Sequence, residues 1–233
     1  GGSWLTAELL RQLTMRKFEV LLYTSPRHYD EIVDDNGSTL KQIADDIGTT
    51  TVITTNINSD SSIKQAITSK TLGIAIGAAW QFETQTAELF NGRLLDLMGI
   101  ALPQYRGGAH YTWQILAGNK IGACNLQIIH GGADTFHRGT IVKRCDYLFP
   151  DSARKPKDYF QAAIVQELNF LNSFFDEVLE GKSFSEQSLQ ESFCSYYPPL
   201  NTLKNGWIDW SWSTNELDRF ICAFDDPYDG AST

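Results

Sequence analysis

Short apolar runs alternate with amphipathic segments through the first half of the chain. The runs are Phe18 to Tyr23, Val52 to Ile53, Leu72 to Gly77 and Leu94 to Met98. Residues 38–48 and 59–68 have helical spacing, with Ser38 as the expected N-cap and Gly48 as the stop of the first segment. Apolar strands that alternate with helices are typical of a parallel sheet covered on both faces.

The second half changes from strands to helices. Expected strands cover 124–129 and 140–147, with an antiparallel component because only a short loop separates them. Expected helices are 111–116, 156–179, a shorter one over 184–191, and 213–224 capped by Ser213 or Thr214. The aromatic stripe of the long helix fits core packing better than a ligand surface. We therefore predict an α/β fold with a Rossmann-like, mostly parallel sheet, helices on both faces and a helical C-terminal extension.

Both ends of the sequence favour a segment of a larger protein. Ser3 is a plausible N-cap for a helix that starts at Trp4, and the strand that normally precedes such a helix is not in the sequence. The run 226–231 reads as a turn that leads into a further domain. We expect a core over 1–180, a C-terminal extension of the same domain over 181–233, and an absent C-terminal domain.

Composition restricts the class of protein. The chain has 233 residues, 42% of them hydrophobic, and 28 acidic against 19 basic residues give a net charge of −9. This charge disfavours nucleic-acid partners. The four cysteines form no CxxC pair, so we expect no metal site and no disulfide, only reduced core cysteines. With no membrane span and no secretion signal evident, the expected location is cytoplasmic. The oligomeric state is not predicted.

Spaced motifs occupy the segment from Ala101 to Val142. In order they are Leu102-Pro103, Tyr105-Arg106-Gly107, Trp113, Gly118, Gly122 and Asp134. A second set is Ile208-Asp209-Trp210, Arg219-Phe220-Ile221 and Pro227-Tyr228-Asp229-Gly230-Ala231. On these residues the chain resembles the folate-dependent formyltransferase family, which includes methionyl-tRNA formyltransferase and the nucleotide-sugar N-formyltransferases.

The resemblance implies transfer of a formyl group from 10-formyltetrahydrofolate to an amine, without a metal. Attack on the formyl carbon creates an oxyanion that needs hydrogen-bond donors, and a proton must leave the amine. In the family an Asn and a His serve the oxyanion and an Asp supports the proton transfer. Counting back from Pro103, the Asn position holds Asp96 and the His position holds Met98, while Asp134 matches. Methionine cannot donate a proton, so the family mechanism should be slow unless a protonated Asp96 donates.

Three histidines could replace the missing imidazole. His110 is the first candidate, and His130 and His137 flank the Asp134 loop. For each, the alternative is an ordinary surface or loop histidine.

The remaining predicted site residues also follow from the resemblance. Tyr105, Arg106 and Gly107 would form the substrate side, where Arg106 either pairs with an anionic group or anchors its loop. The residues that would bind the folate are Gly77, Ala78, Ala79, Trp80, Leu102, Pro103, Ala133 and Asp134.

Three functions remain open at this point. The first is a formyltransferase acting on a small amine such as a nucleotide-linked amino sugar. The second is a catalytically impaired relative that binds a ligand or regulates. The third is a nucleotide-binding Rossmann domain. The sequence has no complete GxGxxG motif, which argues against this third function.

Overall fold

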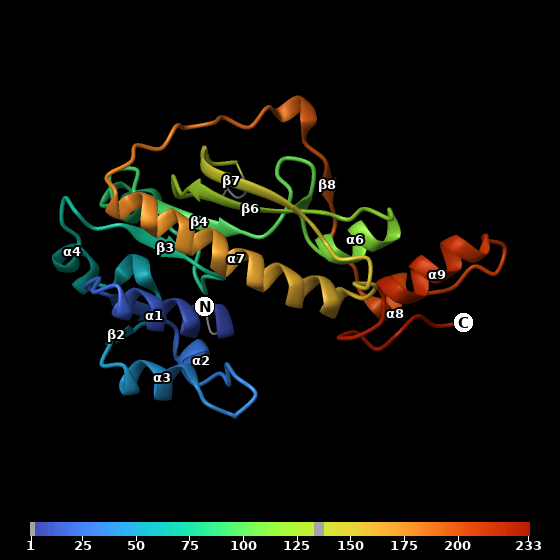
Figure 1. Cartoon of the computed structure of the whole chain (residues 1–233), viewed down its shortest axis with the longest axis horizontal. Coiled ribbons are helices and arrows are strands. Elements are labelled where there is room, and N and C mark those ends of the chain that lie inside the picture. Colours follow the sequence, from blue (N-terminus) through green and yellow to red (C-terminus); the bar gives the residue numbers. More distant parts are fainter. Residues whose placement is uncertain (1–2, 133–137) are drawn as a thin grey trace. The chain divides into compact units, whose positions relative to one another are not determined.

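The computed structural model describes residues 3–132 and 138–233 (Figure 1). The chain divides into two compact units. The first unit contains Gly1–Met98 and Leu126–Val142, and the second contains Gly99–Asn125 and Lys143–Thr233. Each unit is described by itself.

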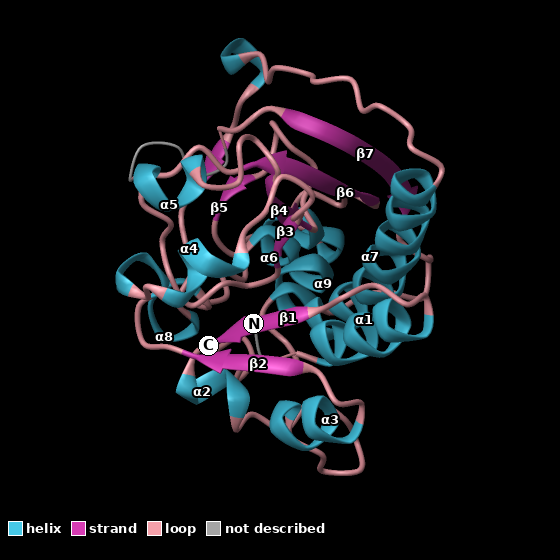
Figure 2. Cartoon of the chain, turned by 90° about the vertical axis from the view of Figure 1, so that its left-hand side faces the viewer, coloured by secondary structure: helices cyan, strands magenta, loops and turns pink. Residues whose placement is uncertain are grey.

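The first unit begins with a helix and a parallel strand pair. Helix α1 (Trp4–Met15) starts at Ser3, whose hydroxyl accepts the Thr6 N–H, as the sequence predicts. Strands β1 (Leu21–Thr24) and β2 (Thr50–Ile53) lie side by side and pair in parallel (Figure 2). Helices α2 (Pro26–Tyr29) and α3 (Leu40–Asp46) lie between them in sequence. Apolar residues of α1, β1 and α3 form one buried cluster.

The N-cap of α3 is Thr39, so the prediction of Ser38 is wrong by one residue. The Thr39 hydroxyl accepts the Gln42 N–H at 3.2 Å, and the Gln42 side chain accepts the Thr39 N–H at 2.8 Å. Both residues of the Ser-Thr pair can cap, but only Thr39 has Gln42 three positions later to complete a capping box.

The second half of the first unit supplies three short helical segments and two strands. They are η1 (Ile57–Ser59), α4 (Ser62–Ala66), β3 (Gly73–Ala75), α5 (Thr84–Glu88) and β4 (Leu94–Met98). The predicted helix over 59–68 is too long, because Asp60 adopts an extended conformation and its carboxylate accepts the Ser62 N–H at 3.0 Å. Strands β3 and β4 are parallel neighbours in a sheet of order β3-β4-β6-β7, whose other members are β6 (Ile121–Ile128) and β7 (Ile141–Leu148).

Strands β6 (Ile121–Ile128) and β7 (Ile141–Leu148) continue from one unit into the other. Where β6 ends and β7 begins, the Ile128 N–H donates to the Thr140 carbonyl at 2.8 Å. Further along, the ring of Tyr147 lies against Gly122. As residue numbers increase along β6, the numbers of the partner residues on β7 decrease. The two strands are therefore antiparallel, which confirms the predicted antiparallel component.

The second unit is mainly helical. It contains β5 (Arg106–Gly107), α6 (His110–Leu116), α7 (Pro156–Leu179), η3 (Glu191–Phe193), β8 (Tyr196–Tyr197), α8 (Thr202–Asn205) and α9 (Thr214–Ala223). Helix α7 has the predicted bounds, and its residues Tyr159, Phe170, Phe174 and Phe175 are buried, as core packing requires. Ser213 caps α9 as predicted.

The predicted helix over 184–191 does not form. Apart from η3 this stretch is extended, and β8 follows and pairs with β5 in parallel. A segment of about eight residues is too short to be helical without tertiary support. Here tertiary contacts favour the extended path, since Phe184 packs on Phe174 at 4.8 Å between ring centroids and Ser195 bonds to Pro103.

Among the described residues no disulfide joins the four cysteines, and Cys124 alone of the four is buried. Cys145 is exposed and Cys194 and Cys222 are partly buried, so the prediction of four core cysteines is wrong for three of them. Apolar sequence neighbours do not by themselves make a position internal. Within the described residues no cluster of side chains is suited to a metal ion. None of the described helices combines the length and apolarity needed to cross a bilayer.

Candidate active site

A cavity of about 390 Å³ lies in the first unit, at the carboxyl ends of the parallel strands β3 and β4. Its lining residues are Ala75, Gly77, Ala78, Trp80, Gln81, Phe82, Asp96, Leu97, Met98, Gln127, Ile128, Ile129, Gly131 and Gly132. Ligands of open α/β sheets bind at this end of the strands, and the volume lies in the range of small-molecule sites.

Two of the predicted catalytic residues meet in this cavity. Asp96 and Met98 are two positions apart on β4, so their side chains lie on the same face of the strand. Burial of the Asp96 carboxyl raises its pKa to about 7. Near neutral pH a large fraction of Asp96 is therefore uncharged and able to donate a hydrogen bond.

The loop after β3 forms another wall of the cavity and contains four of the predicted folate-binding residues, three of which line the cavity. Gly77 has a left-handed φ of +50° and turns the chain away from the strand. The Trp80 indole N–H donates to the Thr55 carbonyl at 3.0 Å, so the polar edge of the ring is already satisfied. Ala78 lines the cavity, whereas Ala79 belongs to the same loop but not to the lining.

Two glycines after β6 make the third wall. Gly131 has φ +77°, and a Cβ there would lie 2.6 Å from backbone atoms of Glu83 and Thr84. The Gly132 N–H donates to the Phe82 carbonyl at 2.9 Å. These glycines were missed by the sequence reasoning, although a Gly-Gly pair directly after an apolar strand was an available signal.

Gln127 was also missed. Its side chain is buried and donates to the Gly139 carbonyl at 2.7 Å, which ties β6 to the residues before β7. Nothing in the sequence distinguishes this glutamine from an exposed one, because its burial depends on strand pairing.

Other predicted site residues belong to the second unit. His110 begins α6, and its ring lies 4.2 Å from that of Tyr111. Leu102 is fully buried and its carbonyl accepts from Arg144, while the Pro103 carbonyl accepts the Ser195 N–H at 3.3 Å. Ala133, Asp134 and His137 lie outside the described residues, and His130 is exposed.

The loop of Tyr105, Arg106 and Gly107 is held in place by several contacts. The Arg106 guanidinium is buried, and its Nη1 donates to both carboxylate oxygens of Glu191 at 3.0 and 2.8 Å. Tyr105 stacks on Tyr197 with 5.1 Å between ring centroids. The contact with Glu191 matches the loop-anchoring alternative for Arg106, and its pairing with a substrate anion remains a prediction.

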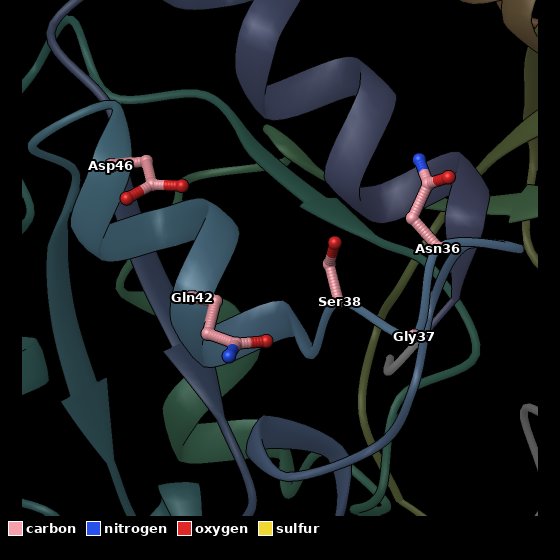
Figure 3. Close-up of a pocket in the computed structure, with 5 residues that line it drawn as sticks. All are labelled: Asn36, Gly37, Ser38, Gln42 and Asp46. Carbon is pink, nitrogen blue, oxygen red and sulfur yellow. The ribbon is translucent and has the colours of Figure 1, made fainter.

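A second hollow, of about 320 Å³, lies beside α3 (Figure 3). Its lining consists of Asn36, Gly37, Ser38, Gln42 and Asp46, all of them polar or glycine. Figure 3 shows that Asn36, Gly37 and Ser38 come from the loop before α3 and that Gln42 and Asp46 come from the helix, and none of these residues is aromatic or apolar apart from the glycine. The cavity beside β4 is therefore the stronger candidate for an organic ligand.

Comparison with known proteins gives relatives for this fold. No protein-family model matches the chain. A stretch of 136 residues is 26% identical to the bifunctional polymyxin resistance protein ArnA of Wigglesworthia glossinidia brevipalpis; it takes in 58% of this chain and 20% of that protein. The chain thus spans only about a fifth of the length of this curated relative.

Solved structures are similar over nearly the whole chain. WlaRD, a sugar 3N-formyl transferase crystallised in the presence of dTDP and 5-N-formyl-THF, has a TM-score of 0.72 at 17% identity and covers 94% of this chain and 75% of its own. The N-formyltransferase from Helicobacter canadensis, in complex with folinic acid and dTDP-3-aminofucose, has a TM-score of 0.73 at 17% identity, with coverage of 94% and 77%.

A third solved structure, methionyl-tRNA formyltransferase from Clostridium thermocellum, has a TM-score of 0.54 at 15% identity, with coverage of 89% and 84%. Together these structures confirm the predicted α/β fold class with its helical C-terminal part, and with ArnA they confirm the resemblance that the motifs carry.

Proposed function

We propose that this chain, which has the fold of the formyltransferases and resembles them in its motifs, moves a formyl group from a reduced folate to an amine of a small molecule. The observation that carries the proposal is the cavity at the end of β4, into which Asp96 and Met98 both project. The positions that the resemblance assigns to catalysis on this strand therefore line the same cavity as the loop assigned to the folate.

In this proposal Asp96 donates a hydrogen bond to the oxyanion. Its pKa of about 7 leaves a proton on the carboxyl in the lower part of the physiological range. A neutral carboxyl can donate one hydrogen bond to an oxygen whose negative charge grows during attack, as an asparagine amide does. An ionised Asp96 would instead repel that oxygen, so activity depends on the protonated form.

The proposed formyl donor is 10-formyltetrahydrofolate, and no metal is involved. When bound, this group supplies a formyl carbon that an amine can attack. The loop from Gly77 to Phe82 and the glycines 131 and 132 would hold its pterin through backbone groups, with Trp80 and Phe82 as apolar walls. WlaRD and the Helicobacter canadensis enzyme were crystallised with 5-N-formyl-THF and with folinic acid, which supports a folate of this class.

The proposed acceptor is an amino sugar attached to a nucleotide. The net charge of −9 disfavours a polyanionic acceptor such as tRNA. The structures of the same two enzymes contain dTDP and dTDP-3-aminofucose, which favours a nucleotide-linked amine here. On attack the amine nitrogen bonds to the formyl carbon and the carbon–N10 bond of the folate breaks. One proton leaves the amine and one is gained at N10. The resemblance assigns the support of this transfer to Asp134.

A second candidate is a catalytically impaired relative that binds the ligand or regulates. Met98 favours it, because a thioether in the place of an imidazole can neither donate a proton nor hold a charge. In that case the cavity would still bind a folate, but turnover would be very slow.

One experiment separates the two. Folinic acid is titrated into the protein by calorimetry, and the protein is then incubated with 10-formyltetrahydrofolate and a dTDP-linked amino sugar while the formylated product is measured by mass spectrometry. Binding with turnover supports the transferase, and binding without turnover supports the impaired relative. No binding of folinic acid would exclude the proposed donor.

A further inference from the structure

The wall of the cavity formed by residues 80–82 is held by a segment that does not itself line the cavity. Asn58, in η1, lies 23 and 25 positions before the two residues that it bonds. Its side-chain Nδ2 donates to the Gln81 carbonyl at 2.9 Å, and its Oδ1 accepts the Glu83 N–H at 2.9 Å. One amide group thus bridges the backbone on both sides of Phe82.

These two bonds fix the orientation of the amide. A carbonyl can only accept and a backbone N–H can only donate, so Nδ2 must face Gln81 and Oδ1 must face Glu83. Aspartate could still accept from Glu83, but it would place an oxygen opposite the Gln81 carbonyl. Alanine would lose both bonds. Asparagine is the residue whose length and two-sided chemistry satisfy this backbone.

The segment that contains Asn58 is itself held in place by packing and hydrogen bonds. Ile57, next to Asn58, is 4% exposed and belongs to the same buried cluster as Phe82. The Asn58 N–H donates to the Asn56 side chain at 3.0 Å, and the Thr55 carbonyl accepts the Trp80 indole. Residues 55–58 therefore hold Trp80, Gln81 and Glu83 from one side, while Gly132 bonds to Phe82 from the other.

We infer that Asn58 is a positioning residue for the folate pocket: its amide sets the backbone of residues 81–83 against which the pterin binds. This inference rests on the proposed function for the identity of the ligand, but not for the bridge itself. Asn58 is only partly buried and its bonds are open to solvent, so each contributes little to the stability of the whole unit. The effect of losing them should be local.

The test compares Asn58→Ala and Asn58→Asp with the same two changes at Asn36. Asn36 is exposed, belongs to the same unit, and makes no hydrogen bond to the described residues 77–83, so Asn36→Asp matches the added charge. Site-resolved hydrogen exchange reports the bridge without any ligand. Exchange of the Glu83 amide should rise about fivefold to tenfold in Asn58→Ala. It should stay near wild type in Asn58→Asp, which keeps that acceptor, and in both Asn36 variants.

Calorimetry with folinic acid then tests the positioning role. The dissociation constant should rise about tenfold in both Asn58 variants and stay unchanged in the Asn36 variants, with the melting temperature nearly constant throughout. Unchanged Glu83 exchange in Asn58→Ala would overturn the bridge. Raised exchange with unchanged folinic acid affinity would overturn the positioning role. If the wild type itself does not bind folinic acid, the proposed donor fails, and the exchange data alone decide whether Asn58 holds the loop.

Discussion

Asp96 and Met98 occupy alternate positions of β4 and line one cavity from the same face of the strand. Among the described residues of the lining, Asp96 is the one titratable group. A carboxyl that holds its proton up to about pH 7 therefore lies beside a thioether that cannot titrate. The pH behaviour of this part of the site follows from Asp96.

The stability of the protein should depend on this carboxyl. The pKa of Asp96 is raised from 3.8 to about 7, so between those values the folded state binds a proton that the unfolded state has lost. The contribution of Asp96 to the free energy of unfolding therefore falls as pH rises through this window. The free energy of unfolding of Asp96→Asn, taken relative to that of wild type, should therefore increase by about 2 kcal/mol from pH 5 to pH 8. Urea unfolding at both pH values measures this, and an equal difference at both would contradict the raised pKa.

If the chain is the catalytically impaired relative, restoring the family residues should restore catalysis. The double variant Asp96→Asn with Met98→His supplies a permanent amide donor and an imidazole, and one oxyanion donor alone changes the rate by about a hundredfold or more. We expect formyl transfer to rise by at least about a hundredfold, measured as product formed per enzyme, with little change in folinic acid affinity. If the variant binds folinic acid but its rate does not change, the alignment of these two positions is wrong.

The Gly-Gly wall gives a test with a matched control. Gly131→Ala and Gly37→Ala both place a side chain at positive φ, at +77° and +81°, and this backbone strain should cost about 1 to 2 kcal/mol at each position, with a further loss at Gly131. Only at Gly131 would the added carbon also meet the backbone of Glu83 and Thr84, since Gly37 has nothing within 4 Å. Folinic acid binding should be lost in Gly131→Ala and kept in Gly37→Ala. Similar affinities in the two variants would place the ligand away from this wall.

The second unit contains another carboxyl with a raised pKa. Burial raises the pKa of Glu167 to about 7, and its carboxylate lies where a Cβ of residue 99 would be. Gly99→Ala should therefore cost about 1 to 3 kcal/mol, because the Glu167 side chain must move.

A double-mutant cycle checks this contact. Adding Glu167→Ala to Gly99→Ala removes the overlap, so the double variant should be at least about 1 kcal/mol more stable than the sum of the single effects. Thermal and urea unfolding give the four free energies. Additive effects would mean that Glu167 and Gly99 are not in contact.

Local patterns in the sequence determined much of the fold. Helix α7 begins at Pro156 and ends before Gly181 as predicted, because proline at the first position and a left-handed glycine after the end are local signals. Strand β4 matches its apolar run from Leu94 to Met98. Side chains alternate along any strand, so the positions of Asp96 and Met98 within this run already place both on one face.

Contacts between distant segments decided the rest. The stretch over 184–191 has a sequence compatible with a helix, but the packing of Phe184 on Phe174 and the pairing of β8 with β5 favour an extended path. The capping box of Thr39 and Gln42 at the start of α3 is, in contrast, a local signal three residues long that could have been read along the chain.

For the site, the sequence identified Asp96 as a residue of interest, while only the tertiary structure gave its pKa, because desolvation depends on the neighbours that exclude water. The sequence also could not reveal the role of Asn58, because its two hydrogen-bond partners lie more than 20 positions away along the chain. Periodicity and capping act over a few residues and can be read along the chain, whereas burial and long-range hydrogen bonds exist only once separate segments have packed together.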